Sequence, residues 1–426
     1  MQIFYKNFEI IFKIFFYFYP LIMFSRSVFI TVYIISISII SFYYLFKKKL
    51  KIIFNLSDYL IFALFFLLAF STLINIEKLG LDSFLKSIFN IRFAFLYLAI
   101  RNLFHYKILN LKILLIITCF CTIFLSVDIF IQHINGKDIF GFEPWHGRYP
   151  GLFIDEAIAG GYIQKFSFIS IPVVFLLNIS NIKKKFMIII ITIILGLGIL
   201  MSTDRIPFIV YLFQVIILII LYSKFRSIYL ISFILLCIIS ILIFKNNSVI
   251  KARYLFLNNL FNLNQEISMD HDFDFNKKVE KIYNRKFLNN NIFQDDYFKI
   301  FYTGYIVWKN NPILGTGNKS FNRSCSELLE VNKDILCAPH AHNLYLEILV
   351  NIGFIGFFLF LAFIFSIFFT IKNNFSYNSK IYSFIVIILI AELLPFRSYG
   401  SIFTTINGSM FWYLLALASS NLYIKK

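Results

Sequence analysis

The sequence has few charged residues and few cysteines. Only 15% of its 426 residues are Asp, Glu, Lys or Arg, against about 25% in an average soluble domain. Five cysteines are too few for a disulfide-stapled secreted scaffold, and a 59% hydrophobic composition is the opposite of that of a disordered chain. An ordinary soluble enzyme is also excluded.

Long apolar segments, rich in phenylalanine, fill most of the chain. A helix needs about 20 apolar residues to cross a bilayer, and the segments predict an all-α, polytopic membrane protein of about 12 transmembrane helices. We place them at residues 8–24, 27–46, 58–75, 88–104, 111–131, 161–180, 186–201, 206–222, 228–244, 343–370, 381–396 and 402–423.

The charge that is present is mostly basic, with 40 Lys and Arg against 22 Asp and Glu. Clusters such as 47–49 and 183–185 fall on one side of the predicted membrane, and an excess of Lys and Arg in short loops marks the cytoplasmic side. We therefore expect a multi-pass membrane protein with both termini in the cytoplasm. Nucleic acid is not needed to explain the charge. The N-terminal segment has no small-residue cleavage site and is expected to remain as the first helix.

The spans divide the chain into four segments. Residues 1–131 hold helices 1–5, residues 132–244 an outer loop and helices 6–9, residues 245–342 a large periplasmic loop, and residues 343–426 helices 10–12. A loop of such length is usually functional or disordered. Apolar residues at helical spacing before Asn310-Asn311-Pro312 predict short helices in this loop, one ending near Lys309 along the outer membrane face.

Cys325 and Cys337 lie in this outer loop, and in an oxidising periplasm we expect them to form a disulfide. Cys337, His340 and His342 could also be read as metal ligands. Their spacing is short and no fourth ligand is apparent, so we predict no metal site and no cofactor.

Polar residues that could carry chemistry are few, and each has a structural alternative. Arg148 and Arg205 offer donor forks suited to a diphosphate, although an arginine near a span end is often an interfacial anchor. His342, beside Asn343 at the mouth of a span, could act as a general base. A structural histidine is the alternative reading, and Asp155 and Glu156 are alternative bases.

Four motifs then point to a family. HAHNLYLEILVNIGFIGFFLF (340–360) resembles the His-Asn-x-x-Leu and Gly-x-x-Gly signature of the O-antigen ligase and polysaccharide polymerase superfamily. Upstream, NNPILGTGNKSFNRSC (310–325), STDR (202–205) and RYPGLFIDEAIAGGYI (148–163) resemble three further motifs in the family order. Asp204 departs from the pattern, because a small residue or Ser is usual there.

The resemblance implies a metal-independent, inverting glycosyltransferase of the multi-span C type. Its donor would be an undecaprenyl-diphosphate-linked glycan at the periplasmic face, and its acceptor lipid A-core or a growing glycan, within membrane lipids. His342 would activate the acceptor hydroxyl, while Arg205, Arg148, His340 and Asn343 would bind substrate. The family's long-loop arginine has Arg285 and Lys299 as its nearest candidates.

Three functions stay open at this point. An O-antigen ligase is favoured, and a polymerase joining repeat units uses the same chemistry. A non-enzymatic flippase or exporter of lipid-linked glycans predicts charges deep in many spans. Here the charges concentrate at span ends and outer loops, apart from Lys13, Arg92, Lys165 and Glu392.

Overall fold

The computed structural model describes residues 2–145, 147–154, 156–254, 296–329, 335–374 and 379–422. Within these ranges the chain is helical and has no strand. Eight of the helices are long and apolar enough to cross a membrane, so the protein is a multi-pass membrane protein by helix length and hydropathy.

Each predicted span overlaps a helix or a pair of consecutive helices, although only eight helices in the described ranges meet the length and hydropathy of a span. The elements that overlap the predicted spans are α1 (Gln2–Tyr17) with α2 (Tyr19–Ile22), α3 (Ser27–Lys47), α4 (Leu56–Ile74), α6 (Leu81–Phe89) with α7 (Arg92–His105), α8 (Leu111–Asn135), α9 (Ala159–Ser170) with η2 (Ile171–Leu176), α10 (Asn181–Met201), α11 (Arg205–Leu221), α12 (Arg226–Asn246), α18 (Leu344–Asn374), α19 (Ser379–Glu392) and α20 (Thr405–Ala418). Short elements connect them: α5 (Ile76–Leu79), η1 (Gly151–Phe153), η3 (Ser223–Phe225), α13 (Ser248–Tyr254), α16 (Asp296–Asn310) and α17 (Ser320–Leu329). Among the spans that consist of a single helix, the shortest are α11, α19 and α20, with 17, 14 and 14 residues.

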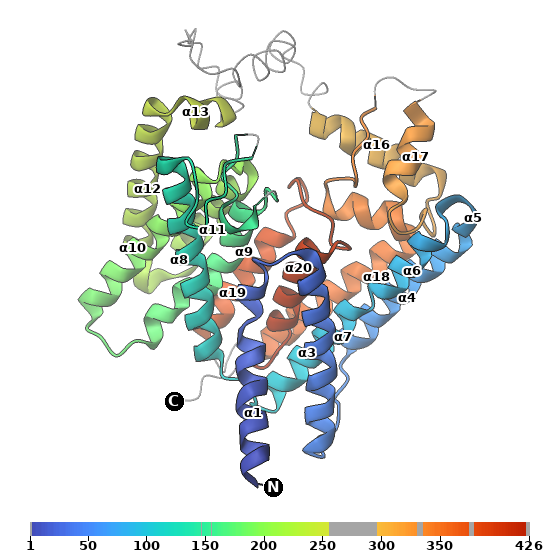
Figure 1. Cartoon of the computed structure of the whole chain (residues 1–426), viewed down its shortest axis with the longest axis horizontal. Helices are drawn as coiled ribbons and strands as arrows, with labels where there is room; N and C mark the ends of the chain where they lie inside the picture. Colours follow the sequence, from blue (N-terminus) through green and yellow to red (C-terminus); the bar gives the residue numbers. More distant parts are fainter. Residues whose placement is uncertain are drawn as a thin grey trace.

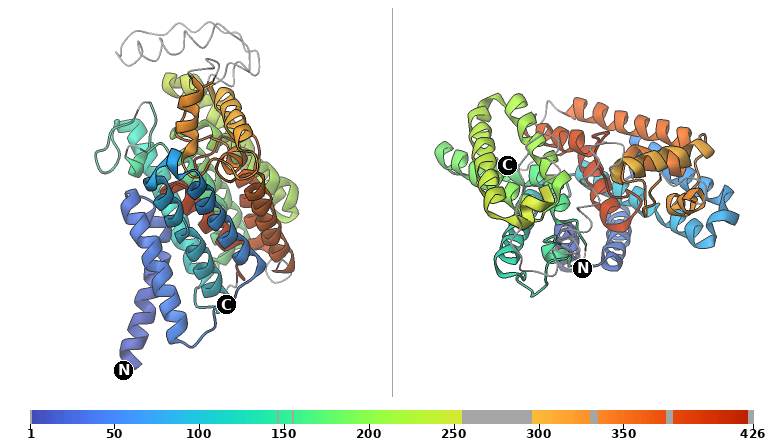
Figure 2. Two further views of the ribbon diagram at one scale, coloured as in Figure 1. Left: turned by 90° about the vertical axis from the view of Figure 1, so that its right-hand side faces the viewer. Right: turned by 90° about the horizontal axis from the view of Figure 1, so that it is seen from above.

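The helices run between two ends of the molecule. The start of α1 and the end of α20 lie at one end, whereas α13, α16 and α17 lie at the other (Figure 1). Both views of Figure 2 place α20 in the interior. All residues of α20 from Gly408 to Ala418 are buried, as expected of a helix that is apolar on all sides. Its Tyr413 stacks on Tyr19 of α2 at a centroid distance of 3.9 Å.

A backbone break divides α18. Gly353 has φ 62° and ψ −164° inside the helix, and a Cβ there would lie 2.2 Å from the Ile313 carbonyl oxygen. Phe354 donates its N–H to the Pro312 carbonyl at 2.8 Å, so the preceding turn satisfies a backbone group that the break frees. The predicted span 343–370 is therefore two helical pieces, joined where only glycine fits.

The outer helices have their own small core. Ile300 and Val307 of α16 pack with Phe321, Ala338 and Val350, and Trp308 lies edge-to-face on Phe354 at 4.8 Å. Helix α16 ends at Asn310, one residue beyond the predicted end. Its apolar face packs on α17 and α18, so protein contacts account for at least part of its amphipathic pattern.

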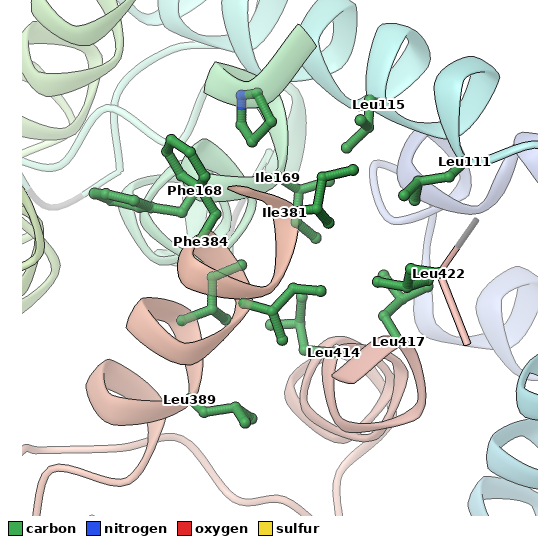
Figure 3. A pocket seen from close by; sticks show the side chains of 13 residues that line it. Leu111, Leu115, Phe168, Ile169, Ile381, Phe384, Leu389, Leu414, Leu417 and Leu422 are labelled. Carbon is green, nitrogen blue, oxygen red and sulfur yellow. The ribbon is translucent and has the colours of Figure 1, made fainter. Parts of the chain in front are cut away.

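A small apolar cavity lies among α8, α9, α19 and α20 (Figure 3). Its volume is about 20 Å³, and leucine, isoleucine and phenylalanine side chains dominate its lining. Such a volume admits about one water molecule, and an apolar lining offers that water no partner. The cavity is therefore a packing defect rather than a substrate site.

Candidate active site

The two histidines of the 340–343 segment lie against each other. Their ring centroids are 4.1 Å apart, and Tyr297 of α16 meets the His342 ring edge-to-face at 5.8 Å. His342 has φ 51°, a left-handed conformation that a non-glycine residue adopts at a cost and that is common at functional sites. Burial and, to a smaller extent, the neighbouring His340 together lower the pKa of His342 to about 4. The imidazole is therefore neutral at pH 7 and can accept a proton.

A second segment, residues 393–404, clamps the histidines. The Tyr399 N–H donates to the His342 carbonyl at 2.7 Å, and Nε2 of His340 lies 3.3 Å from the Tyr399 carbonyl oxygen. Because that oxygen can only accept, Nε2 of His340 carries the proton. Asn343 donates to the Pro395 carbonyl at 2.6 Å, and its Oδ1 accepts from the N–H groups of Tyr345 and Leu346 at the start of α18. The backbone around His342 is thereby fixed from both sides.

Buried charges hold this clamp in place. The Tyr399 hydroxyl donates to Glu392 of α19 and accepts from Lys165 of α9, and Lys165 also contacts Glu392 directly. Arg397 donates to the second Glu392 oxygen at 3.1 Å and to Gln164 at 2.8 Å. Lys165, Glu392 and Arg397 are exposed by only 3%, 1% and 8%. Charges buried to this extent persist only when paired, so the three form one structural unit with Tyr399.

Arg148 lies across from Asp204, in a second cluster on the other face of α9. Arg148 Nη1 is 3.7 Å from Asp204 Oδ1, and the Gly160 N–H of α9 donates to Asp204 Oδ2 at 3.0 Å. A Cβ at Gly160 would lie 2.5 Å from Ser202 Oγ, so glycine permits this approach. Burial raises the pKa of the Asp204 carboxyl to about 6, against the opposing effect of Arg148.

The turn between α10 and α11 fixes the Arg148 loop. Thr203, with φ 63°, donates its hydroxyl to the Gly147 carbonyl at 3.0 Å, and the Tyr149 N–H donates to the Ser202 carbonyl at 3.3 Å. Arg253 of α13 reaches the same Gly147 carbonyl at 3.4 Å. Arg205, half-buried, is the first residue of α11. The 147–149 loop, the 202–205 turn and α13 thus bring Arg148 to Asp204 and Arg253 to the neighbouring Gly147 carbonyl, and Arg205 follows Asp204 directly at the start of α11.

Helix α9 connects the two clusters. Gly160 contacts Asp204, and Lys165, five residues later, contacts Tyr399. Five residues of helix correspond to a rise of about 7.5 Å. The partner of Arg148 and the residue that holds the histidines therefore contact the first half of one buried helix, although His342 lies 137 residues after Arg205 and 194 residues after Arg148.

Other predicted residues are placed as follows. Cys325 and Cys337 form a disulfide with a Cα–Cα distance of 5.6 Å, which ties α17 to the non-helical segment before His340. Arg285 and Asp155 lie outside the described residues, while Lys299 belongs to α16 and Glu156 is exposed beside η1. Within the described ranges, no three His, Cys, Asp or Glu side chains are placed to hold a metal ion.

Sequence reasoning missed Tyr399, Arg397 and Arg253. Lys165 and Glu392 stood out as charges inside apolar runs, but the sequence did not indicate that they meet. For Arg397 and Tyr399 the available signal was the polar segment LLPFRSYG (393–400), which separates the last two apolar segments. An arginine and a tyrosine in such a short break are candidates for pairing with charges buried in neighbouring helices.

The fold and the site define a polytopic membrane protein. Its candidate site contains the His340–His342 pair and, in a second cluster, Arg148 and Arg253. Residues 190–361 match the family model described as O-antigen ligase. This part of the chain is therefore similar to that family, and it contains three of the four motifs, at 202–205, 310–325 and 340–360. The family consists of membrane enzymes, covers O-antigen ligases and polymerases, and implies lipid-linked glycan substrates. No protein of curated function matches the sequence. The matched region includes Arg205, His340, His342 and Asn343.

Proposed function

We propose that the protein transfers an undecaprenyl-diphosphate-linked glycan to an acceptor hydroxyl at the periplasmic face of the bacterial inner membrane. The reaction that we favour is ligation of O-antigen to lipid A-core. The observation that carries the proposal is that α9 contacts both Asp204, the partner of Arg148, and Tyr399, which holds His342. Residues 190–361 of the same chain match the O-antigen ligase model.

His342 is the proposed general base. It accepts the proton of the acceptor hydroxyl as that oxygen bonds to the anomeric carbon of the donor sugar. A positioned base typically contributes about 10²–10⁴-fold. A pKa of about 4 is low for this role, but a bound anion close to the ring stabilises the imidazolium and raises the pKa.

Arg205 and Arg148 are the proposed diphosphate ligands. As the anomeric carbon–oxygen bond to the carrier breaks, negative charge develops on the departing diphosphate, and guanidinium groups stabilise it in a partly desolvated site. The new bond forms on the face opposite the leaving group, so the anomeric configuration inverts. No step of this mechanism requires a metal ion.

His340 and Asn343 have proposed roles beside the base. Both polar atoms of the Asn343 amide are engaged, one with the Pro395 carbonyl and the other with the first N–H groups of α18. We therefore assign Asn343 to positioning His342. His340 keeps its Nδ1 lone pair for a substrate hydroxyl, because its Nε2 proton is held by Tyr399.

We propose twelve crossings with both termini in the cytoplasm. Eight helices meet the length and hydropathy expected of a span, and α11 and part of α19 are shorter apolar helices. The start of α1 and the end of α20 at the same end of the molecule (Figure 1) fit an even number of crossings. Lysines 47–49 follow α3 at this end, as the positive-inside rule requires.

Deletion of the gene separates the two reactions of this chemistry. Loss of a ligase leaves long glycan chains on the lipid carrier, whereas loss of a polymerase leaves surface lipid capped with single repeat units. Long carrier-linked chains support the proposal. Single capped units assign the polymerase reaction instead, and an unchanged glycan profile contradicts both.

A further inference from the structure

Trp145 and Arg148 pair across a tight turn in the loop that follows α8. The N–H of each residue donates to the carbonyl oxygen of the other at 2.9 Å, which makes an isolated antiparallel bridge. Gly147, inside the turn, has φ 70°, the left-handed conformation that such two-residue turns require. Residues opposite each other in an antiparallel bridge project their side chains to the same face, with Cβ atoms about 5 Å apart. The indole and the guanidinium therefore leave the turn on the same face.

Neighbouring elements hold this turn in a fixed position. The Gly147 carbonyl accepts hydrogen bonds from the Thr203 hydroxyl at 3.0 Å and from Arg253 Nε at 3.4 Å. The ring of Tyr149 lies edge-to-face on His133 of α8, with a centroid distance of 4.7 Å. A ligand that contacts the turn thus meets groups that are already ordered, which lowers the entropic cost of binding.

The Trp145 side chain is unusually exposed for a tryptophan. Trp145 is 42% exposed, whereas Trp412 of α20 is completely buried and Trp308 packs on Phe354. The side chain of Arg148 is 34% exposed, so both members of the pair can be reached from solvent. Tryptophan and arginine are enriched among the residues that dominate binding interfaces. The pair is therefore suited to a ligand that combines an anionic group with an apolar face.

A glycosyl diphosphate has this combination. Its first sugar is bonded through the anomeric carbon to an oxygen of the diphosphate, so the sugar ring and the negative charge are direct neighbours. One face of a pyranose ring presents mainly C–H groups, which pack on the large apolar face of an aromatic ring. With the diphosphate at Arg148, as in the proposed function, the adjoining sugar comes within reach of the Trp145 indole. An interfacial membrane anchor, another common role of an exposed tryptophan, needs no fixed pairing with an arginine.

We propose that Trp145 forms, with Arg148, a subsite for the donor glycan, in which the indole stacks on the sugar ring next to the diphosphate. The inference rests on the proposed function and extends it from the leaving group to the sugar. It gives the site a means to distinguish donor from product. Once the glycan has been transferred, the remaining carrier diphosphate keeps its contact with Arg148 and lacks the sugar that contacts Trp145. Spent carrier is thus bound more weakly than loaded carrier and is displaced by it.

The test measures dissociation constants of the full-length protein in phosphatidylcholine nanodiscs, without lipid A-core. The two ligands are undecaprenyl diphosphate and the undecaprenyl-diphosphate-linked glycan purified from the cells in which the protein occurs. Trp145→Ala is expected to weaken binding of the glycan-bearing ligand about tenfold and to leave binding of undecaprenyl diphosphate unchanged. Trp145→Phe keeps an aromatic face and should retain most of the affinity. Phe140→Ala is the matched control, because Phe140 is 62% exposed on the same loop and lies outside the bridge; it should bind both ligands like the wild type.

Other outcomes overturn the subsite. Equal losses of affinity for both ligands in Trp145→Ala mean that the ring acts on Arg148 or on the fold and not on the sugar. An equal loss in Phe140→Ala assigns the exposed rings to the membrane interface, and a wild type that binds both ligands with the same affinity has no sugar subsite.

Transfer to lipid A-core, measured on the same samples, separates the two proposals. A wild type that binds the glycan-bearing carrier more tightly through Trp145 but transfers nothing refutes the proposed function and leaves the subsite supported. Transfer by the wild type, with glycan affinity unchanged in Trp145→Ala, supports the proposed function and refutes the subsite.

Discussion

The backbone N–H of Tyr399 donates to the carbonyl oxygen of His342 at 2.7 Å, so a residue between the last two helices holds the proposed base. The other end of Tyr399 is anchored to Lys165 and Glu392, which are buried on α9 and α19. The position of the imidazole thus depends on charges inside the helical core. This anchoring role accounts for the pairing of Lys165 with Glu392, two of the few charged residues within apolar runs.

Tyr399→Phe tests this coupling. The substitution keeps the aromatic ring and the backbone hydrogen bonds, and removes only the hydroxyl between Lys165 and Glu392. We expect kcat to fall about tenfold, because a mispositioned base loses part of its contribution, and the donor KM to stay unchanged. Tyr382→Phe is the control, since that buried hydroxyl donates to the Ser420 carbonyl just beyond the end of α20. A wild-type kcat in Tyr399→Phe refutes the coupling.

Asp204 predicts a pH dependence of donor binding. With a pKa raised to about 6, the carboxyl is protonated below pH 6 and ionised above it. The ionised form attracts Arg148, 3.7 Å away, and competes with the donor diphosphate for that guanidinium. The donor KM is therefore expected to rise between pH 5 and 7 in the wild type and to stay flat in Asp204→Asn. Parallel KM profiles in the two proteins contradict this competition.

The Cys325–Cys337 disulfide predicts redox-dependent stability of the outer region. Closing a loop with a sequence separation of 12 residues limits the unfolded chain, an effect of about 3 kcal/mol in the chain-entropy description. Cys325→Ser with Cys337→Ser should lower the temperature at which α16 and α17 become susceptible to protease. Reducing agent should have the same effect on the wild type. Cys237→Ser, at a free cysteine, is the control, and equal protease sensitivity of the double variant and this control disproves the prediction.

Chelation tests the metal-independent mechanism. The described parts of the chain bring no set of three metal-binding side chains together, and the proposed mechanism uses guanidinium groups in place of a cation at the diphosphate. Transfer measured in EDTA should equal transfer in buffer with Mg²⁺. A rate lost in EDTA and restored by added Mg²⁺ rules out the mechanism as written.

The elements were predictable from sequence and most of their contacts were not. Apolar runs end where lysines or Gly and Pro begin, so the predicted spans overlap the observed helices, of which eight are long and apolar enough to cross a membrane. The break at Gly353 was not foreseen, because it depends on the close approach of Ile313, forty residues earlier. Likewise, His342 and Arg205 were identifiable from short motifs, whereas Tyr399 and Arg397 were not, since their roles arise from the packing of α9 against α19.

The rate of glycan transfer by purified His342→Ala is the most direct test of the central claim. The full-length variant is compared with wild type and with His105→Ala, which makes the same change at the far end of α7, using a carrier-linked glycan donor and lipid A-core. Loss of the base is expected to lower kcat by at least about 100-fold, with protein level and thermal stability unchanged, while His105→Ala transfers at the wild-type rate. Wild-type transfer by His342→Ala would contradict the account.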